Sequence, residues 1–172
     1  VVERHWARWA ARRGIDVSEI LAVSHGRPTI DTLRLVAPHL ATDEEATRID
    51  ADEARDTDGV RPVRGALELV ASLPPSRWAV VTSANRALAV ARLAAAGFPR
   101  PDVLVTVDDV ALGKPNPAPY LHAARQLSAP AHRSIVLEDT PVGVQAVPLI
   151  GTMSCGQAEK AMTQSISARS TR

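Results

Sequence analysis

Apolar positions recur with helical spacing through the first third of the chain. Trp6, Trp9 and Ala10 lie three or four residues apart with charged residues nearby, and this pattern predicts an amphipathic helix. The same spacing continues over residues 17–23 and 30–36, which predicts two further helices. Because no apolar run of strand type accompanies them, we expect an all-helical unit at this end of the chain.

The stretch from Thr42 to Asp56 extends this helical region with few large apolar side chains. It is rich in Asp, Glu, Ala and Arg, so we expect a solvated helix. Turn-forming residues, including Gly and Pro, follow at 57–62. We therefore place a domain boundary near residue 60, with a small all-helical domain over residues 1–60.

Beyond this boundary, short apolar runs alternate with helical stretches. The expected strands are residues 77–81, 103–107 and 135–137, and the expected helices are residues 85–96, residues 117–127 and a segment from about 143. Alternating strands and helices predict a parallel sheet with helices on its faces. The predicted fold is therefore α/β, with a Rossmann-like parallel sheet core over residues 61–150. Residues 151–172 lack apolar periodicity, and we expect a disordered tail there.

Composition and charge exclude several classes of protein. The 172 residues are 45% hydrophobic and 23% charged, unlike disordered, collagen-like or disulfide-scaffold chains. The formal net charge of +1 offers no strong field to attract nucleic acid or an anionic membrane. Cys155 has no cysteine partner in the chain, and no apolar run of about 18 residues predicts a membrane span. We expect a cytoplasmic monomer with neither nucleic acid nor membrane as a partner.

Polar side chains follow each predicted strand. Thr82 and Ser83 follow the first, Lys114 lies in the loop after the second, and Glu138 and Asp139 follow the third. Ligands of such sheets bind at the carboxyl ends of the strands, so we expect these side chains to converge. Hydroxyl and backbone N–H groups donate to phosphate, an ammonium group neutralises phosphoryl charge, and carboxylates bind Mg²⁺. The set predicts a phosphate and magnesium site.

Each motif also has a purely structural interpretation. Thr82 and Ser83 precede a predicted helix and could form its N-cap. The Gly-Lys-Pro-Asn-Pro sequence at 113–117 could be a solvated turn in which Pro opens a helix. Glu138 and Asp139 could favour the positive end of the following helix dipole. The order of the motifs, each behind an apolar strand, favours the functional interpretation.

In this order, the motifs make the chain resemble the haloacid dehalogenase superfamily. Val-Val-Thr-Ser at 80–83 is similar to its second motif, Gly-Lys-Pro-Asn-Pro-Ala-Pro-Tyr at 113–120 to its third, and Leu-Glu-Asp-Thr-Pro-Val-Gly-Val-Gln-Ala at 137–146 to its fourth. The resemblance covers roughly residues 1–146 and implies that the helical domain is a cap. Residues 24–31 hold the position of the specificity loop in the sugar-phosphate and glycerol-phosphate phosphatases.

The resemblance implies a role for each matching residue. Thr82 would hydrogen-bond the transferring phosphoryl group, with help from the backbone at Ser83 and Ala84. Lys114 would stabilise negative charge on the phosphoryl oxygens and on the nucleophile. These residues would form the catalytic and phosphate-binding part of the site.

Metal and substrate contacts are implied in the same way. Asp139 would ligate Mg²⁺, with Glu138 beside it directly or through water. His25 and Arg27 would reach from the cap to the distal end of the substrate, or they would belong to a plain loop on the cap surface. Asn85 would be a polar group near the substrate, or simply the N-cap of the following helix.

The first motif of the superfamily has no counterpart in this pattern. That motif supplies a nucleophilic Asp and, two residues later, an acid–base Asp, just after a central strand. Residues 56–58, Asp-Thr-Asp, have the right spacing but follow a charged stretch, so we interpret them as the turn between cap and core. The chain begins with Val1 rather than Met, and we expect its natural N-terminus to lie upstream. The absent strand would lie between the strands that end at Thr82 and Glu138.

Together these features predict a Mg²⁺-dependent phosphatase of small sugar or polyol phosphates that acts through an aspartyl-phosphate intermediate. The chain itself would be a truncated form without the nucleophile. Two alternatives stay open: a phosphomutase of hexose phosphates, which would share the cap type, and a non-catalytic remnant that binds phosphorylated ligands.

Overall fold

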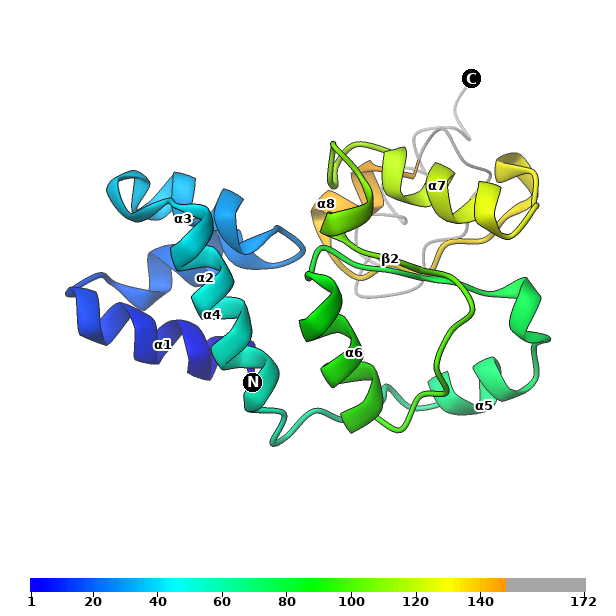
Figure 1. Ribbon diagram of the computed structural model, residues 1–172, viewed down its shortest axis with the longest axis horizontal. Helices are drawn as coiled ribbons and strands as arrows, with labels where there is room; N and C mark the ends of the chain where they lie inside the picture. Colours follow the sequence, from blue (N-terminus) through cyan, green and yellow to red (C-terminus); the bar gives the residue numbers. More distant parts are fainter. Residues whose placement is uncertain (148–172) are drawn as a thin grey trace, which may run out of the picture.

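The computed structural model describes residues 1–147, in which four N-terminal helices stand beside a unit of helices and strands (Figure 1). The helices are α1 (Val2–Arg13), α2 (Val17–Ser24), α3 (Thr29–Val36), α4 (Asp43–Arg55), α5 (Ala66–Ala71), α6 (Arg86–Ala95), α7 (Ala118–Gln126) and α8 (Pro141–Gln145). The strands are β1 (Val80–Val81) and β2 (Leu104–Val105), and the 3-10 turns are η1 (Pro38–Leu40), η2 (Pro75–Arg77), η3 (Val107–Asp109) and η4 (Ala131–Arg133). The tail predicted over residues 151–172 lies outside the described residues.

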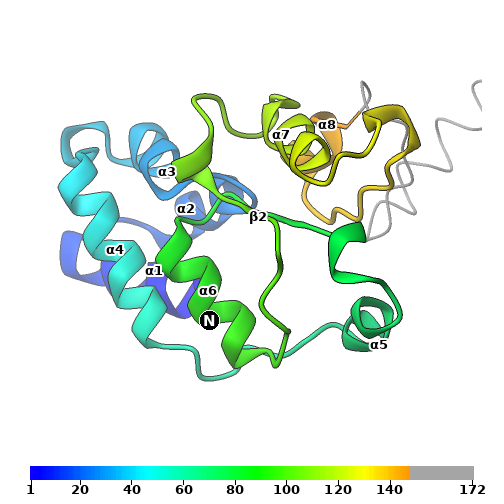
Figure 2. The ribbon, with the colours of Figure 1, turned by 45° about the vertical axis from the view of Figure 1, so that its right-hand side comes forward.

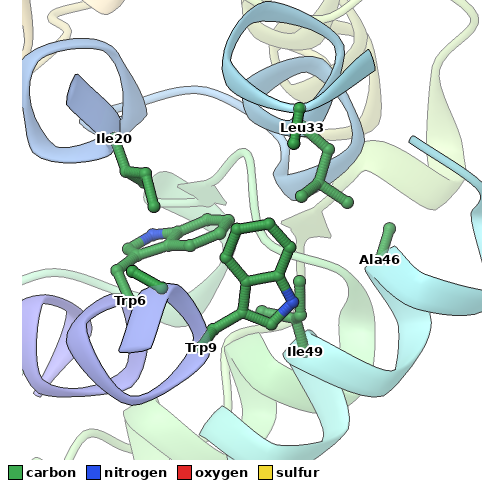
Figure 3. Packing of buried hydrophobic residues seen from close by; sticks show 8 residues of the cluster. Trp6, Trp9, Ile20, Leu33, Ala46 and Ile49 are labelled. Carbon is green, nitrogen blue, oxygen red and sulfur yellow. The ribbon is translucent and has the colours of Figure 1, made fainter. Parts of the chain in front are cut away.

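Helices α1 to α4 enclose one hydrophobic core (Figure 3). Trp6 and Trp9, on the apolar face predicted for α1, are buried, and their rings meet edge to face with centroids 5.7 Å apart. Ile20 of α2 and Leu33 of α3 are fully buried against them. The predicted helical unit therefore has its own core, while its boundary near residue 60 stays a prediction.

Helix α4 is more deeply packed than the sequence suggested. We expected a solvated helix, but Ala46 and Ile49 belong to the cap core and Glu53 is buried as well. The helix also lies along α6 in both ribbon views (Figures 1 and 2). The expectation was wrong because Ala46, Ile49 and Glu53, three and four residues apart, form an inward face although only one of them is a large apolar residue.

Strands β1 and β2 form a parallel pair, as predicted. Val80 lies opposite Leu104, and Val81 lies opposite Val105, which is fully buried. Helix α7 packs against both strands through buried side chains that include Ala123. This parallel sheet with flanking helices and a helical cap confirms the predicted α/β fold class.

The third predicted strand is not formed. Residues 135–137 pair with no strand in the described part of the chain, and Ile135 and Leu137 are 69% and 56% exposed. An apolar sequence becomes a strand only where a neighbour accepts and donates its backbone hydrogen bonds. Within residues 1–147 no such neighbour lies beside this segment, so the prediction of a strand here was wrong.

The described helices include none with both the length and the apolar character that crossing a membrane requires.

Candidate active site

The turn after β1 carries the residues of the second motif. The Thr82 N–H donates to the Val105 carbonyl oxygen at 2.9 Å, which continues the sheet, and the Thr82 Oγ1 accepts from the Ala84 N–H at 3.1 Å. Asn85 caps α6, because its Oδ1 accepts from the Leu88 N–H at 2.9 Å. The turn thus ends a strand and begins a helix, and it leaves the hydroxyl hydrogen of Thr82 able to donate to a ligand.

Lys114 lies buried at this edge of the sheet. Its Nζ donates to Glu138 Oε2 at 2.8 Å, lies 3.5 Å from the Val81 carbonyl oxygen, and is 5.2 Å from the centre of the Tyr120 ring. The side chains of Lys114 and Glu138 are only 6% and 8% exposed. The structure therefore brings Lys114, Glu138 and the end of β1 together, although each comes from a different part of the sequence.

Both carboxylate oxygens of Glu138 are occupied. Oε2 accepts from Lys114 and, at 2.7 Å, from the Tyr120 hydroxyl, while Oε1 accepts from the Thr140 hydroxyl and N–H. Burial alone would raise the pKa of Glu138, but the charge of Lys114 and these hydrogen bonds lower it. Burial and the bond to Glu138 raise the pKa of Tyr120. Helix α8 allows this packing, because a Cβ on Gly143 would overlap the Glu138 carboxyl group.

The described carboxylates do not fit a complete magnesium site. Asp139 is exposed and available, but Glu138 is committed to Lys114, Tyr120 and Thr140. Within residues 1–147, no three side chains of the His, Cys, Asp and Glu types gather in a group suited to a metal. Magnesium binds through octahedral oxygen sets, and one free carboxylate supplies too little of such a set.

The loop of residues 24–28 connects the cap to this edge of the sheet. The Ser83 hydroxyl donates to the Gly26 carbonyl oxygen at 2.7 Å. Gly26 has a φ of 77°, and a Cβ there would lie 2.6 Å from Thr140 Oγ1 and 2.8 Å from Val142 Cγ2. Glycine is therefore required both by the backbone and by the close approach. The loop rests between the second and fourth motifs.

His25 and Arg27 flank Gly26 in this loop. His25 is exposed, and its Nδ1 lies 3.1 Å from the Leu21 carbonyl oxygen. Among the described residues, the Arg27 guanidinium group has no hydrogen-bond or ion-pair partner, so it is free to meet a ligand. The loop that holds them contacts the turn after β1 through the Ser83–Gly26 hydrogen bond, and their contact with a substrate stays a prediction.

Asp50 on α4 was not among the site residues predicted from the sequence. Its Oδ1 accepts from the Thr29 hydroxyl at 2.5 Å, and its Oδ2 accepts from the Asn85 side-chain amide at 3.0 Å. Burial raises the pKa of Asp50. The available signal was its spacing, since Asp50 lies four residues after Ala46 and three before Glu53, on the inward face of the helix.

Asp56, the superficial match to the first motif, pairs with side chains of α1 in the cap. Its carboxylate is 2.6 Å from an Arg4 nitrogen, 3.1 Å from an Arg8 nitrogen and 3.4 Å from His5 Nε2. Burial would raise the pKa of Asp56, but the two arginines lower it. Residues 56–58 lie in the connection after α4, where the Val60 N–H donates to the Thr57 carbonyl oxygen at 3.0 Å to close a turn, in agreement with our interpretation.

Comparisons with known proteins agree with this geometry. A family model described as haloacid dehalogenase-like hydrolase matches residues 2–151. Hexitol phosphatase A of Escherichia coli strain K12 is 40% identical over 148 residues, which cover 83% of this chain and 68% of the relative. Glycerol-1-phosphate phosphohydrolase 2 of Saccharomyces cerevisiae is 32% identical over 154 residues, covering 83% of this chain and 62% of the relative. The chain thus spans about two thirds of the length of these two curated relatives.

Solved structures show the same fold. A hydrolase from Pseudomonas syringae superimposes with a TM-score of 0.71 at 23% identity, over 90% of this chain and 75% of that one. A family IA, variant 3 hydrolase from Entamoeba histolytica gives a TM-score of 0.70 at 20% identity, over 93% and 78%. With the family match over residues 2–151, these findings show that the chain belongs to the haloacid dehalogenase-like hydrolases.

Proposed function

We propose that the chain carries the phosphate-binding and charge-stabilising part of a phosphatase for small sugar or polyol phosphates. The observation that carries this proposal is the buried ammonium group of Lys114, held at the end of β1, 3.5 Å from the carbonyl oxygen of Val81, the residue before Thr82. A fixed cation in a site that excludes water stabilises the charge of a transferring phosphoryl group. The relatives named for hexitol phosphates and glycerol 1-phosphate support the substrate class.

Lys114 can bind a phosphoryl oxygen without giving up its present partners. An ammonium group has three N–H donors. Two of these donors point to Glu138 and to the Val81 carbonyl oxygen, which leaves the third N–H donor for the ligand. The Thr82 hydroxyl and the backbone N–H groups at Ser83 and Ala84 would donate to the remaining phosphoryl oxygens.

Turnover requires a nucleophile in addition to this binding site. In the proposed reaction an aspartate attacks phosphorus, and an acid protonates the leaving alkoxide. Among residues 1–147, no aspartate is hydrogen-bonded to or paired with Lys114. We propose that residues 1–172 alone bind phosphorylated ligands without turnover. In this proposal, Mg²⁺ dependence requires carboxylates beyond Asp139.

The experiment measures the affinity for inorganic phosphate and for a hexitol phosphate by calorimetry. Lys114→Ala should weaken both by about tenfold or more, because a hydrogen bond to a charged group is lost. Arg125→Ala removes an exposed cation from α7 and should leave both affinities unchanged. Unaltered binding by the Lys114 variant would refute the proposal.

A second comparison separates a phosphatase from a binding remnant. The chain is assayed as it stands and again with an upstream apolar strand that carries Asp-x-Asp. Activity that appears only with the added strand supports the phosphatase, and binding without activity in both forms supports the remnant. Turnover by the unextended chain, abolished by Asp56→Asn, would move the site to the cap.

A further inference from the structure

Asp50 lies where three elements of the cap and core meet. Its carboxylate accepts one hydrogen bond from Thr29 at 2.5 Å and another from Asn85 at 3.0 Å. Thr29 is the first residue of α3 and directly follows the loop of residues 24–28. Asn85 ends the phosphate-binding turn and caps α6. A single side chain of α4 thus touches the residues that end both functional segments.

We propose that Asp50 is a positioning residue that fixes the loop of residues 24–28 against the phosphate-binding turn of residues 82–85. The naming of these segments rests on the proposed function. The contacts themselves are independent of it. This assigns a role in substrate selection to a residue of the cap that need not touch the substrate.

Two contacts at different places determine how the loop is oriented. The Ser83 hydroxyl holds the Gly26 carbonyl oxygen at 2.7 Å, and Gly26 also lies close to Thr140 and Val142, so the middle of the loop is fixed. The Thr29–Asp50–Asn85 bridge holds the end of the loop to the end of the same turn. With both contacts in place, the direction in which the loop presents its side chains is set.

The bridge has the chemistry of a strong contact. Asp50 accepts through both oxygens, and hydrogen bonds to an ionised carboxylate are stronger than neutral ones. The site is also partly removed from water, so an unmade bond would leave a polar group without compensation. One turn further along α4, Glu53 pairs with Arg92 of α6 and keeps the two helices together.

An exchange of the two side chains tests this role. Asp50→Asn keeps an oxygen for Thr29 but turns an amide toward the amide of Asn85. Asn85→Asp keeps the cap on the Leu88 N–H but sets two carboxylates face to face. The double variant Asp50→Asn with Asn85→Asp interchanges donor and acceptor, so it restores the bridge.

Amide hydrogen exchange of residues 25–30 gives a readout that needs no ligand. Each single variant should raise exchange there by about tenfold or more, because a charge-assisted bond is lost. The double variant should return exchange to near the original rate. Asp52→Asn is the matched control on the same helix, since Asp52 is 41% exposed and among residues 1–147 pairs only with Arg55, and it should leave this exchange unchanged.

Ligand binding then separates this proposal from the proposed function. Asp50→Asn, which leaves the phosphate-binding turn itself unchanged, should weaken the binding of a hexitol phosphate more than that of inorganic phosphate, because only the larger ligand reaches the loop. If the original chain binds neither ligand, the proposed function fails, while the exchange data still decide the role of Asp50. Unchanged exchange in both single variants would overturn the positioning role. If the single variants unfold throughout, failure of the double variant to restore folding and exchange overturns it as well.

Discussion

The helical cap and the α/β core differ in how much apolar surface they bury. In the cap, two indole rings and the branched side chains of α2, α3 and α4 form one continuous core. In the described part of the core, two small clusters form around Tyr120 and Val105, and other buried residues such as Leu88 and Val142 lie outside both. Stabilisation scales with apolar area removed from water, at about 25 cal/mol per Å². The cap therefore gains more from burial than the core does.

The difference teaches that, within residues 1–147, one region has a continuous hydrophobic core while the sheet of the other consists of a single pair of strands. Among the described residues, β1 pairs only with β2, and Ile135 and Leu137 face solvent. A parallel strand beside β1 would cover these side chains and satisfy backbone groups at the same time. Substitutions in the cap should therefore lower the free energy of unfolding of the chain as given. Several substitutions in the core should lower it only in a chain that also carries that strand.

The largest effect is expected in the cap. Trp9→Ala removes a buried ring that also donates to Glu45 at 2.7 Å, and it should lower the free energy of unfolding by about 3–5 kcal/mol. Urea denaturation followed by circular dichroism measures this loss. The control Leu35→Ala, at a position 57% exposed, should change stability by less than about 0.5 kcal/mol. Equal losses of stability in the two variants would contradict the conclusion that burial of the cap core stabilises this chain.

The next effect tests the tightest packing in the core. Gly143→Ala places a methyl group where the Glu138 carboxyl group now lies, so Glu138 must move away from Lys114. We expect a loss of about 1–3 kcal/mol in urea denaturation, together with weaker phosphate binding. Gly113→Ala is the matched control, because its Cβ would lie 3.8 Å from Pro28 Cγ. If Gly143→Ala is as well tolerated as the control, the core is looser than its contacts indicate.

Acid should weaken the cap through Glu45. Burial alone would raise the pKa of Glu45, but hydrogen bonds from Trp9, Arg13 and Arg48 lower it from 4.5 to about 2. A depressed folded-state pKa stabilises the protein fully above pH 4.5, and this stabilisation is lost as the pH falls toward about 2. Glu45→Gln should therefore lose less stability over this range. Thermal melts followed by tryptophan fluorescence measure the loss of stability with falling pH. A Trp78→Phe background restricts the signal to the two cap tryptophans. The same pH dependence in both proteins would disprove the role of Glu45.

The smallest effect sharpens the comparison most directly. Leu137→Ser should change stability by less than about 0.5 kcal/mol, because Leu137 is already 56% exposed. In a chain extended by an apolar strand beside β1, the same substitution should cost about 1.5–3 kcal/mol, the value of a buried leucine. Thermal melts of the four proteins give both numbers. A large loss of stability in the unextended chain would show that the contribution of Leu137 does not depend on an added strand.

Local patterns were sufficient to predict most helices and the meeting of Lys114 and Glu138 at the end of β1. The spacing of Trp6 and Trp9 identified the inner face of α1, and the position of Lys114 after an apolar run placed it at the sheet edge. Both follow from short-range periodicity combined with general rules of parallel sheets. Asp56 was also interpreted correctly, because a charged helix rather than a strand precedes it.

Features that depend on neighbours distant in sequence could not be predicted in this way. Residues 135–137 have strand composition, but pairing is decided by what lies beside them. From the sequence, Asp50 resembles any exposed acidic residue of a charged helix. Its hydrogen bonds to Thr29 and Asn85 form only because folding brings α3 and α6 next to α4. The hydrogen bond between Glu138 and Tyr120 was likewise not predicted, because a carboxylate at the end of a predicted strand suggested a metal ligand.

The contact between Ser83 and Gly26 has a consequence for how this scaffold diversifies. The core holds the loop through a main-chain carbonyl oxygen, which every residue type possesses. His25 and Arg27, on either side, contribute no side-chain hydrogen bond to this attachment. The two positions can therefore be randomised as a small library while the loop stays docked, which would test the substrate contacts proposed for them without rebuilding the fold.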